Sequence, residues 1–527
     1  MILRSLILPI LLAGLTSGHI SLTFPPARYP PLDFLDNLRT QQPCGVPRPL
    51  VRKFSNLFLS ARYTDLYVGE TYNISWRMQF VHKGGFRITL LDENGNKVEQ
   101  ILPVSKDKNF TDDSEIITLS APYKPQQSCQ HCILRVEKQA LDFGKSYEFF
   151  TCADINVLPG KPTDEDLCLG NGVFKDGKCA CKPMFSGEWC QFKDDCSKDE
   201  DCQNGGKCME QKNSIIHNAC FCSFGFYGIN CAQTMTKKPT NDECFNFQMP
   251  LKKETFTNYG LFNSKCYKKH ILNTDNVVYS RVVGTELELI IDYKGTSWVA
   301  LGWRPLGINK SCRLFPDLEN IKWKRDVENK TSFNKTESVK ESDNDKIEPF
   351  DLKPVQKAEE PKNNGFLLNA LEAELHPMDC SDIITASIVD GYLRINDMYS
   401  RDRSTPLSDT WFEGEESLTA AYGIEVEGRT VVMFRREISE IEPSDHPLGP
   451  GKIFVIYSKG IEKGADMNAG RNVTVNEGMQ VENKDVLNYH GSMSLTQYHV
   501  FIVYSCLISC NETMQPVQSV SSLQVFP

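Results

Sequence analysis

The sequence of 527 residues contains no long run of lysine and arginine and, beyond its first segment, no apolar stretch of about 18 residues. The first absence argues against nucleic acid as a partner, because binding to phosphates needs clustered basic residues. The second predicts no transmembrane anchor. Phosphate loops, dinucleotide fingerprints and nucleophile elbows are absent as well, so no motif indicates a common class of enzyme.

The first 43 residues contain no cysteine, but the whole chain contains 20. Half of these cysteines lie in the segment from Cys168 to Cys231. An even count with such local density is typical of a disulfide framework that forms in an oxidising compartment. We therefore expect a secreted, extracellular protein.

The start of the chain agrees with secretion. One arginine, Arg4, precedes an apolar run that ends near Leu12, and the small residues Thr16 and Gly18 follow. This pattern predicts a signal peptide over residues 1–18, so that the mature chain begins at His19, with a cut one residue to either side as the alternative. Seven sequons also predict a glycoprotein. Their asparagines are Asn73, Asn109, Asn309, Asn329, Asn334, Asn472 and Asn511.

Residues 19–160 alternate apolar and polar side chains over 72–76 and 86–90, which is typical of half-buried strands. The Asn-Gly pair at 94–95 predicts a hairpin turn, because both residues tolerate positive φ. No helical period is present. We expect an immunoglobulin-like β-sandwich.

Residues 241–510 alternate in the same way over 286–291, 297–301, 430–434 and 452–457, which predicts a second β-sandwich. The segment 321–367 is rich in lysine, glutamate, aspartate and asparagine, so it predicts a disordered loop between two strands, or else a linker between domains. A C-terminal tail occupies 511–527. The predicted fold class is all-β, with two sandwiches joined by small disulfide-rich modules.

The region between the sandwiches carries a specific cysteine pattern. Residues 192–232 show the spacing C-x5-C-x5-C-x11-C-x-C-x8-C and resemble an EGF-like module, and residues 161–191 resemble a truncated one. The resemblance implies the pairs Cys196–Cys208, Cys202–Cys220 and Cys222–Cys231, although six cysteines alone allow 15 connectivities. We interpret the modules as a structural spacer.

Calcium or another ligand of these modules is the alternative. The acidic pair Asp194 and Asp195 precedes the first cysteine of the complete module, but the segment after Cys208 lacks the remaining calcium-binding pattern of the family.

His19 would offer two nitrogen ligands at a mature N-terminus, its α-amine and its imidazole. A second histidine would complete a three-nitrogen set that suits Cu(II). His82 is the better partner, because the Gly84-Gly85 pair after it allows close approach, whereas His131 lies between two cysteines. A terminal histidine can also be an accident of cleavage, and a lone histidine is more often a surface residue than a ligand.

Four short motifs resemble the lytic polysaccharide monooxygenase clan, and more closely its copper-binding, non-oxidative branch. They lie at 19–28, 43–45, 82–85 and 149–155. The resemblance implies a copper site called a histidine brace, formed by His19 and His82. It also implies a carboxylate ligand, for which Asp154 is the first candidate and Asp142 the alternative, and an aromatic side chain nearby, either Phe149 or Phe150.

Motifs in the second sandwich resemble the DOMON domain of dopamine-hydroxylase-like and ferric-reductase-like proteins. They lie at 297–303, 379–383, 397–406 and 428–436. The resemblance implies haem or a sugar as ligand, with a methionine and a histidine holding haem. His490 matches the histidine region, but the methionine expected within 304–309 is missing, which favours a plain ligand-binding or interaction domain.

These patterns together predict a secreted modular protein that binds copper and recognises a glycan or an extracellular matrix or cell-surface protein. A copper-dependent polysaccharide monooxygenase, and thus a copper-dependent oxidoreductase, is one alternative. A non-catalytic adhesion protein is the other.

Overall fold

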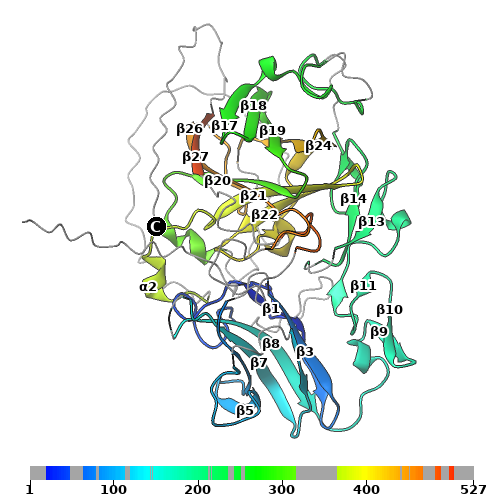
Figure 1. The fold of residues 1–527 in the computed structure, drawn as a ribbon, viewed down its shortest axis with the longest axis vertical. Coiled ribbons are helices and arrows are strands. Elements are labelled where there is room, and N and C mark those ends of the chain that lie inside the picture. The colour runs from blue at the N-terminus through cyan, green and yellow to red at the C-terminus, as the bar shows by residue number, and fades with distance from the viewer. Residues whose placement is uncertain are drawn as a thin grey trace, which may run out of the picture.

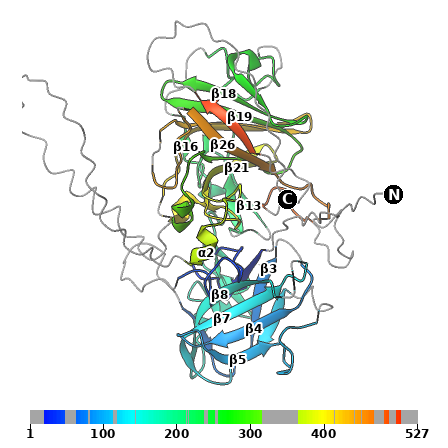
Figure 2. The same cartoon turned by 90° about the vertical axis from the view of Figure 1, so that its left-hand side faces the viewer.

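The chain forms two β-sandwich lobes, with small disulfide-rich modules along one side of both (Figures 1 and 2). The computed structural model describes residues 19–47, 63–78, 82–112, 119–142, 144, 146–211, 214, 216–235, 242–250, 256–315, 365–412, 414–439, 442–449, 451–466, 481–487 and 498–503. The predicted leader 1–18, most of the predicted insertion 321–367 and the tail 511–527 lie outside these residues.

Two sheets that share one apolar core make up the N-terminal lobe. The first sheet has the order β1 (Ile20–Phe24), β3 (Tyr72–Met78) and β6 (Ser120–Tyr123). The second has the order β2 (Thr64–Tyr67), β8 (Glu148–Leu158), β7 (Cys129–Gln139), β4 (Phe86–Leu91) and β5 (Lys97–Leu102). The strands predicted at 72–76 and 86–90 are confirmed.

The predicted turn at 94–95 joins β4 to β5. The Asp92 carboxylate accepts hydrogen bonds from the backbone N–H groups of Asn94 and Asn96, at 2.9 and 2.8 Å. Gly95 takes a φ of 84°, which a side chain would disfavour. The predicted turn is confirmed, with a positive φ at Gly95 and with contacts of the Asp92 side chain that the sequence analysis did not predict.

The C-terminal lobe also has two sheets around one core, which contains Tyr293, Trp303 and Phe434. One sheet has the order β17 (Lys268–Ile271), β18 (Asn276–Val283), β19 (Glu286–Lys294), β25 (Arg429–Glu437) and β24 (Leu418–Val426). The other has the order β23 (Leu407–Ser408), β22 (Tyr392–Ser400), β21 (Ser381–Val389), β20 (Val299–Pro305), β26 (Gly451–Lys459) and β27 (Tyr498–Val503).

Helix is scarce. The described residues contain one α-helix, α2 (Leu368–Leu371), and none of their helices is long and apolar enough to cross a membrane. The protein is all-β, as predicted.

The modules between the lobes are built from two-stranded ladders. Their strands are β9 (Gly172–Lys175), β10 (Lys178–Cys181), β11 (Phe185–Ser186), β12 (Phe192–Lys193), β13 (Lys207–Glu210), β14 (Asn218–Phe221), β15 (Phe226–Tyr227) and β16 (Gln233–Thr234). So few strands bury little apolar surface, and the disulfides supply most of the core of the second module.

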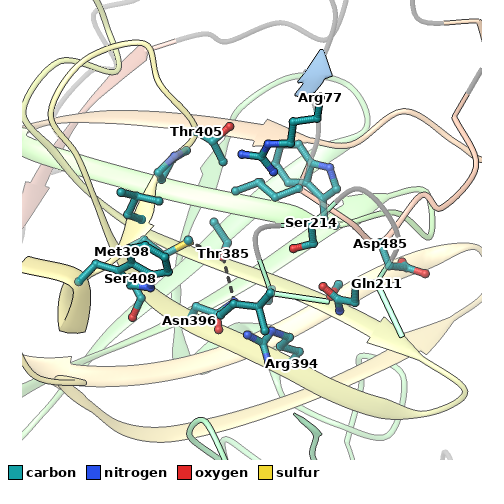
Figure 3. Close-up of a pocket in the computed structure, with 18 residues that line it drawn as sticks. Arg77, Gln211, Ser214, Thr385, Arg394, Asn396, Met398, Thr405, Ser408 and Asp485 are labelled. Atoms are coloured by element: carbon teal, nitrogen blue, oxygen red, sulfur yellow. Dashed lines mark hydrogen bonds between the residues drawn. The ribbon is translucent and has the colours of Figure 1, made fainter. Parts of the chain in front are cut away.

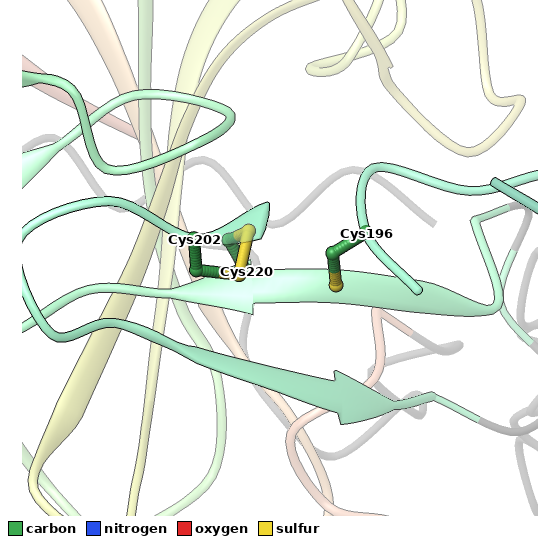
Figure 4. Close-up of side chains that lie close together, drawn as sticks. All are labelled: Cys196, Cys202 and Cys220. Carbon is green, nitrogen blue, oxygen red and sulfur yellow. A yellow bond between two sulfur atoms is a disulfide. The ribbon is translucent and has the colours of Figure 1, made fainter. Parts of the chain in front are cut away.

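Disulfides join all the cysteines that the structure describes. In the complete module the pairs are Cys196–Cys208, Cys202–Cys220 and Cys222–Cys231, the pairing that the EGF-like resemblance implies. Figure 4 shows Cys196 beside the Cys202–Cys220 bridge. Because bonded sulfurs are poor metal ligands, this group of three is a disulfide core. The other described bridges are Cys44–Cys152, Cys129–Cys132, Cys168–Cys179, Cys181–Cys190, Cys244–Cys266 and Cys312–Cys380.

The complete module is docked on the C-terminal lobe, which the spacer interpretation did not predict. The backbones of Cys222 and Leu393 exchange two hydrogen bonds of 2.6 and 2.8 Å, and Arg394 pairs with Asp195 at 3.0 Å. Asp194 accepts hydrogen bonds from the backbone and side chain of Asn218 at 3.1 and 2.7 Å. Both acidic residues of the calcium alternative are thus engaged in protein contacts.

Three of the predicted glycosylation sites lie on the surface. The side chains of Asn73, Asn109 and Asn309 are exposed, so a glycan could be attached at each. Asn329, Asn334, Asn472 and Asn511 lie outside the described residues.

Candidate metal centre

His19 lies directly before β1, at the junction of the two lobes. Its Nδ1 is 3.0 Å from the Oδ1 of Asp33, and its ring is tilted against Phe34 with centroids 5.4 Å apart. The next backbone N–H, of Ile20, donates to the Asp33 carbonyl at 2.9 Å. The side chain of His19 and the backbone of the next residue therefore both contact Asp33.

Asp33 is the residue of this centre that the sequence analysis missed. It is fully buried, and it also accepts hydrogen bonds from the N–H and Oγ1 of Thr405 at 2.8 and 2.6 Å. Burial alone would raise the pKa of Asp33, but His19, Arg77 and Thr405 outweigh burial and hold that pKa well below its usual range. Asp33 is therefore a carboxylate at neutral pH.

His82 follows β3 and is 2 % exposed. Its Nδ1 lies 3.1 Å from the Oδ2 of Asp142, which also accepts a hydrogen bond from the Lys83 backbone at 3.0 Å. These contacts outweigh burial and lower the pKa of Asp142. A Cβ on Gly85 would lie 1.9 Å from the Thr111 carbonyl oxygen, so this glycine permits the close approach that the sequence predicted.

A phenylalanine ring lies beside each of the two histidines. Phe34 contacts His19, Phe149 stacks on His82 with centroids 5.6 Å apart, and the two phenylalanine rings are 5.2 Å apart. Phe150 points to the other face of β8, where Arg135 lies over its ring. Of the two aromatic candidates, the structure places Phe149 beside a histidine.

The structure does not bring Asp154 to the histidines. Its two carboxylate oxygens accept hydrogen bonds of 2.9 and 2.7 Å from the Arg28 guanidinium, which also donates to the Val46 carbonyl. Asp154 also lies five residues beyond Phe149 on β8, about 16 Å at the rise of an extended strand. Asp142, the alternative carboxylate, is the one that contacts His82.

His131, the other histidine of this lobe, lies elsewhere. It is on β7 between the bridged Cys129 and Cys132, with its side chain 54 % exposed. Its ring contacts Tyr63 and its Nδ1 is 4.0 Å from Glu93.

The connection from β22 to β23 in the C-terminal lobe covers the histidine centre. Ser404 accepts a hydrogen bond of 3.1 Å from the Phe34 backbone, Thr405 bonds Asp33, and the Arg403 guanidinium lies over the Phe34 ring. His19 is accordingly only 8 % exposed. The centre is thus a lobe interface and not an open face.

Cavities border this interface. One of about 100 Å³ is lined by Arg77 of the N-terminal lobe and by Met398 and Thr405 of the C-terminal lobe (Figure 3). A larger one of about 750 Å³ is lined by Arg28 and Asp154 of the N-terminal lobe, Asp194 of the modules and Trp411 of the C-terminal lobe.

The predicted haem ligand His490 lies outside the described residues. Met398 accepts a hydrogen bond from Thr385 at 3.0 Å and faces the smaller cavity. That cavity of about 100 Å³ is well below the ~300–1,000 Å³ of typical ligand sites.

Comparison with known proteins gives short or weak matches, and no family model matches the chain. Protein glp-1 of Caenorhabditis elegans is 33% identical over 81 residues, which are 14% of this chain and 6% of that protein. Protein eyes shut homolog of Danio rerio is 33% identical over 87 residues, 15% of this chain and 3% of that protein. The chain thus spans a small fraction of the length of these relatives.

Two solved structures are similar to part of the chain. A chitin binding domain from Burkholderia pseudomallei has 12% identity and a TM-score of 0.16, covering 27% of this chain and 100% of its own. A cellulose-active polysaccharide monooxygenase from M. thermophila has 15% identity and a TM-score of 0.16, covering 28% of this chain and 79% of its own. At this similarity, neither structure says what the present chain binds.

Proposed function

We propose that this protein is an extracellular copper-binding protein whose metal site is formed by His19 and His82. The observations that carry the proposal are the two buried histidines of the N-terminal lobe, each with a carboxylate beside its Nδ1, and the Phe149 ring stacked on His82. The many disulfides are consistent with an extracellular location.

The donor set fits Cu(II). Asp142 holds the Nδ1 of His82, which leaves Nε2 as the ligand atom, the arrangement usual for metal-binding histidines. At a mature N-terminus, the α-amine and Nδ1 of His19 would close a six-membered chelate ring. Copper on the Nδ1 of His19 would replace the proton that this atom shares with Asp33, so we assign the carboxylate ligand to Asp33 in place of Asp154. When bound, copper would supply a redox-active centre with nitrogen and oxygen ligands.

Burial of the centre favours copper binding over polysaccharide oxidation. The side chains of His19 and His82 are nearly inaccessible, and Ser404 and Thr405 are hydrogen-bonded across the site. A crystalline polysaccharide could reach the histidines only if the lobes separated. We therefore propose that the site holds or transfers copper without cleaving glycans.

Copper titration followed by electron paramagnetic resonance tests the proposal on the secreted protein, after N-terminal sequencing. We expect a chain that starts at His19 and binds one copper tightly. His82→Ala should abolish the tight signal, and Asp142→Asn should weaken affinity by about 10–100-fold, because it releases the ligand ring. His131→Ala is the matched control and should bind like the wild type.

If the mature chain starts at another residue, His19 has no free α-amine to bind copper, and the proposal is wrong. So would a His82→Ala variant with an unchanged tight signal. Incubation with chitin or cellulose and a reductant should yield no oxidised oligosaccharides; their release would assign the monooxygenase function instead.

A further inference from the structure

Five carboxylates meet inside the C-terminal lobe, in a group that the copper proposal does not use. Asp382 lies in β21, Asp397 in β22 and Asp409 at the start of the short 3-10 helix η6 (Asp409–Phe412), while Glu442 and Asp445 follow β25. All five are buried. Oxygens of Asp382, Asp397 and Asp445 lie within 4.8 Å of one another, and so do oxygens of Asp409, Glu442 and Asp445.

One basic side chain among the described residues pairs with this cluster. Arg436 is fully buried and lies 2.8 Å from Asp382, 3.0 Å from Asp445 and 4.0 Å from Asp397. Even without Glu442, four aspartates against one guanidinium leave a formal charge of −3 in the interior when all of them are ionised. Burying uncompensated charge is costly unless protons or a cation neutralise it.

Asp409 points specifically to a ligand. Its side chain is 1 % exposed, and neither of its oxygens accepts a hydrogen bond from any described residue. The Oδ1 atoms of Asp382 and Asp397 likewise accept none.

We propose that Asp382, Asp397, Asp409 and Asp445 bind a calcium ion, with Glu442 beside them. An all-oxygen donor set of several carboxylates suits a hard cation that takes six to eight ligands at flexible geometry. Zinc prefers nitrogen and sulfur ligands from histidine and cysteine, which the cluster does not offer, and magnesium retains several waters that a buried site would exclude.

The ion would also position the contact between the lobes. Asp409 opens η6, and Trp411 two residues later stacks on Tyr29 of the N-terminal lobe, with ring centroids 5.5 Å apart and planes 8° from parallel. The Tyr29 hydroxyl also donates to the Trp411 carbonyl. Calcium would therefore fix the position of Trp411, which contacts Tyr29 of the N-terminal lobe.

The test uses the full secreted chain, stripped with a chelator and titrated with calcium chloride by calorimetry and thermal unfolding. We expect the wild type to bind calcium and its Tm to rise, because the ion binds the folded state alone. Asp409→Asn should weaken calcium affinity by on the order of tenfold or more.

Asp397→Asn provides a second site variant with the same expected loss of calcium affinity. Asp390→Asn, in the exposed turn between β21 and β22, is the matched control and should change neither quantity. If the wild-type protein shows no heat of binding and no change in Tm at millimolar calcium, the proposal is wrong. The carboxylates of the cluster would then be neutralised by shared protons. A calcium response that both site variants retain places the ion elsewhere and also overturns it.

Discussion

Replacing Arg436 by methionine is expected to lower the free energy of unfolding by about 3–5 kcal/mol, the usual cost of removing one partner from a buried charge network. The guanidinium touches Asp382 and Asp445, and it also lies over the Trp303 ring, 5.0 Å from the centroid. Its loss leaves Asp382, Asp397 and Asp445 without the guanidinium that faces them. Urea unfolding of the full chain, followed by tryptophan fluorescence, measures the loss.

Lys294→Met is the control for this experiment. The Lys294 side chain is 63 % exposed and pairs with Asp275 at 3.4 Å, so removing its charge should cost less than about 1 kcal/mol. If calcium occupies the cluster, it should restore more stability to the Arg436→Met variant than to the wild type. A loss below about 1 kcal/mol for Arg436→Met would show that the carboxylates are neutral without it.

Removing the Cys44–Cys152 bridge with paired alanine substitutions is expected to cost about 2–5 kcal/mol. The bridge joins residues 108 apart, so it restricts the unfolded chain strongly, and both sulfurs lie in a small core with Leu91 and Ile133. It also ties the irregular segment 25–47, which carries Asp33, to β8. Copper affinity should therefore fall together with stability.

The matched control removes the Cys129–Cys132 bridge, whose residues are only three apart. The entropic contribution of a disulfide grows with loop length, so this pair of substitutions should cost clearly less. Thermal unfolding and copper titration of both double variants provide the comparison. Equal losses from the two bridges would contradict the role assigned to Cys44 and Cys152.

Local patterns predicted much of the fold. Alternating side chains marked β3, β4, β19 and β26, because a half-buried strand has period two regardless of its partners. The cysteine spacing and the resemblance built on it agreed with the module pairs, because these bridges close short loops. No local pattern in the sequence indicated that Cys222 pairs with Leu393, because this contact joins two surfaces that are far apart in the sequence.

The candidate sites likewise divide into residues that local sequence indicated and residues that only the folded chain brings together. His82 could be proposed from the residues next to it in the sequence. Gly85 follows it, and the lack of room for a side chain at Gly85 is a local property that a glycine in the sequence indicates. Asp33 was missed because a non-repetitive loop folds back to reach His19. The carboxylate cluster was missed because its members converge through sheet register, with β21 and β22 pairing so that Ile384 faces Asp397.

The backbone pairing of Cys222 with Leu393 also bears on how the protein would respond to force. Flexible linkers let neighbouring domains move independently, whereas this module is hydrogen-bonded to an edge of the lobe that follows it. Tension applied between the sandwiches would load these bonds and the Arg394–Asp195 pair before it extended any connecting chain. The complete module would therefore move together with the C-terminal lobe and would not act as a flexible tether.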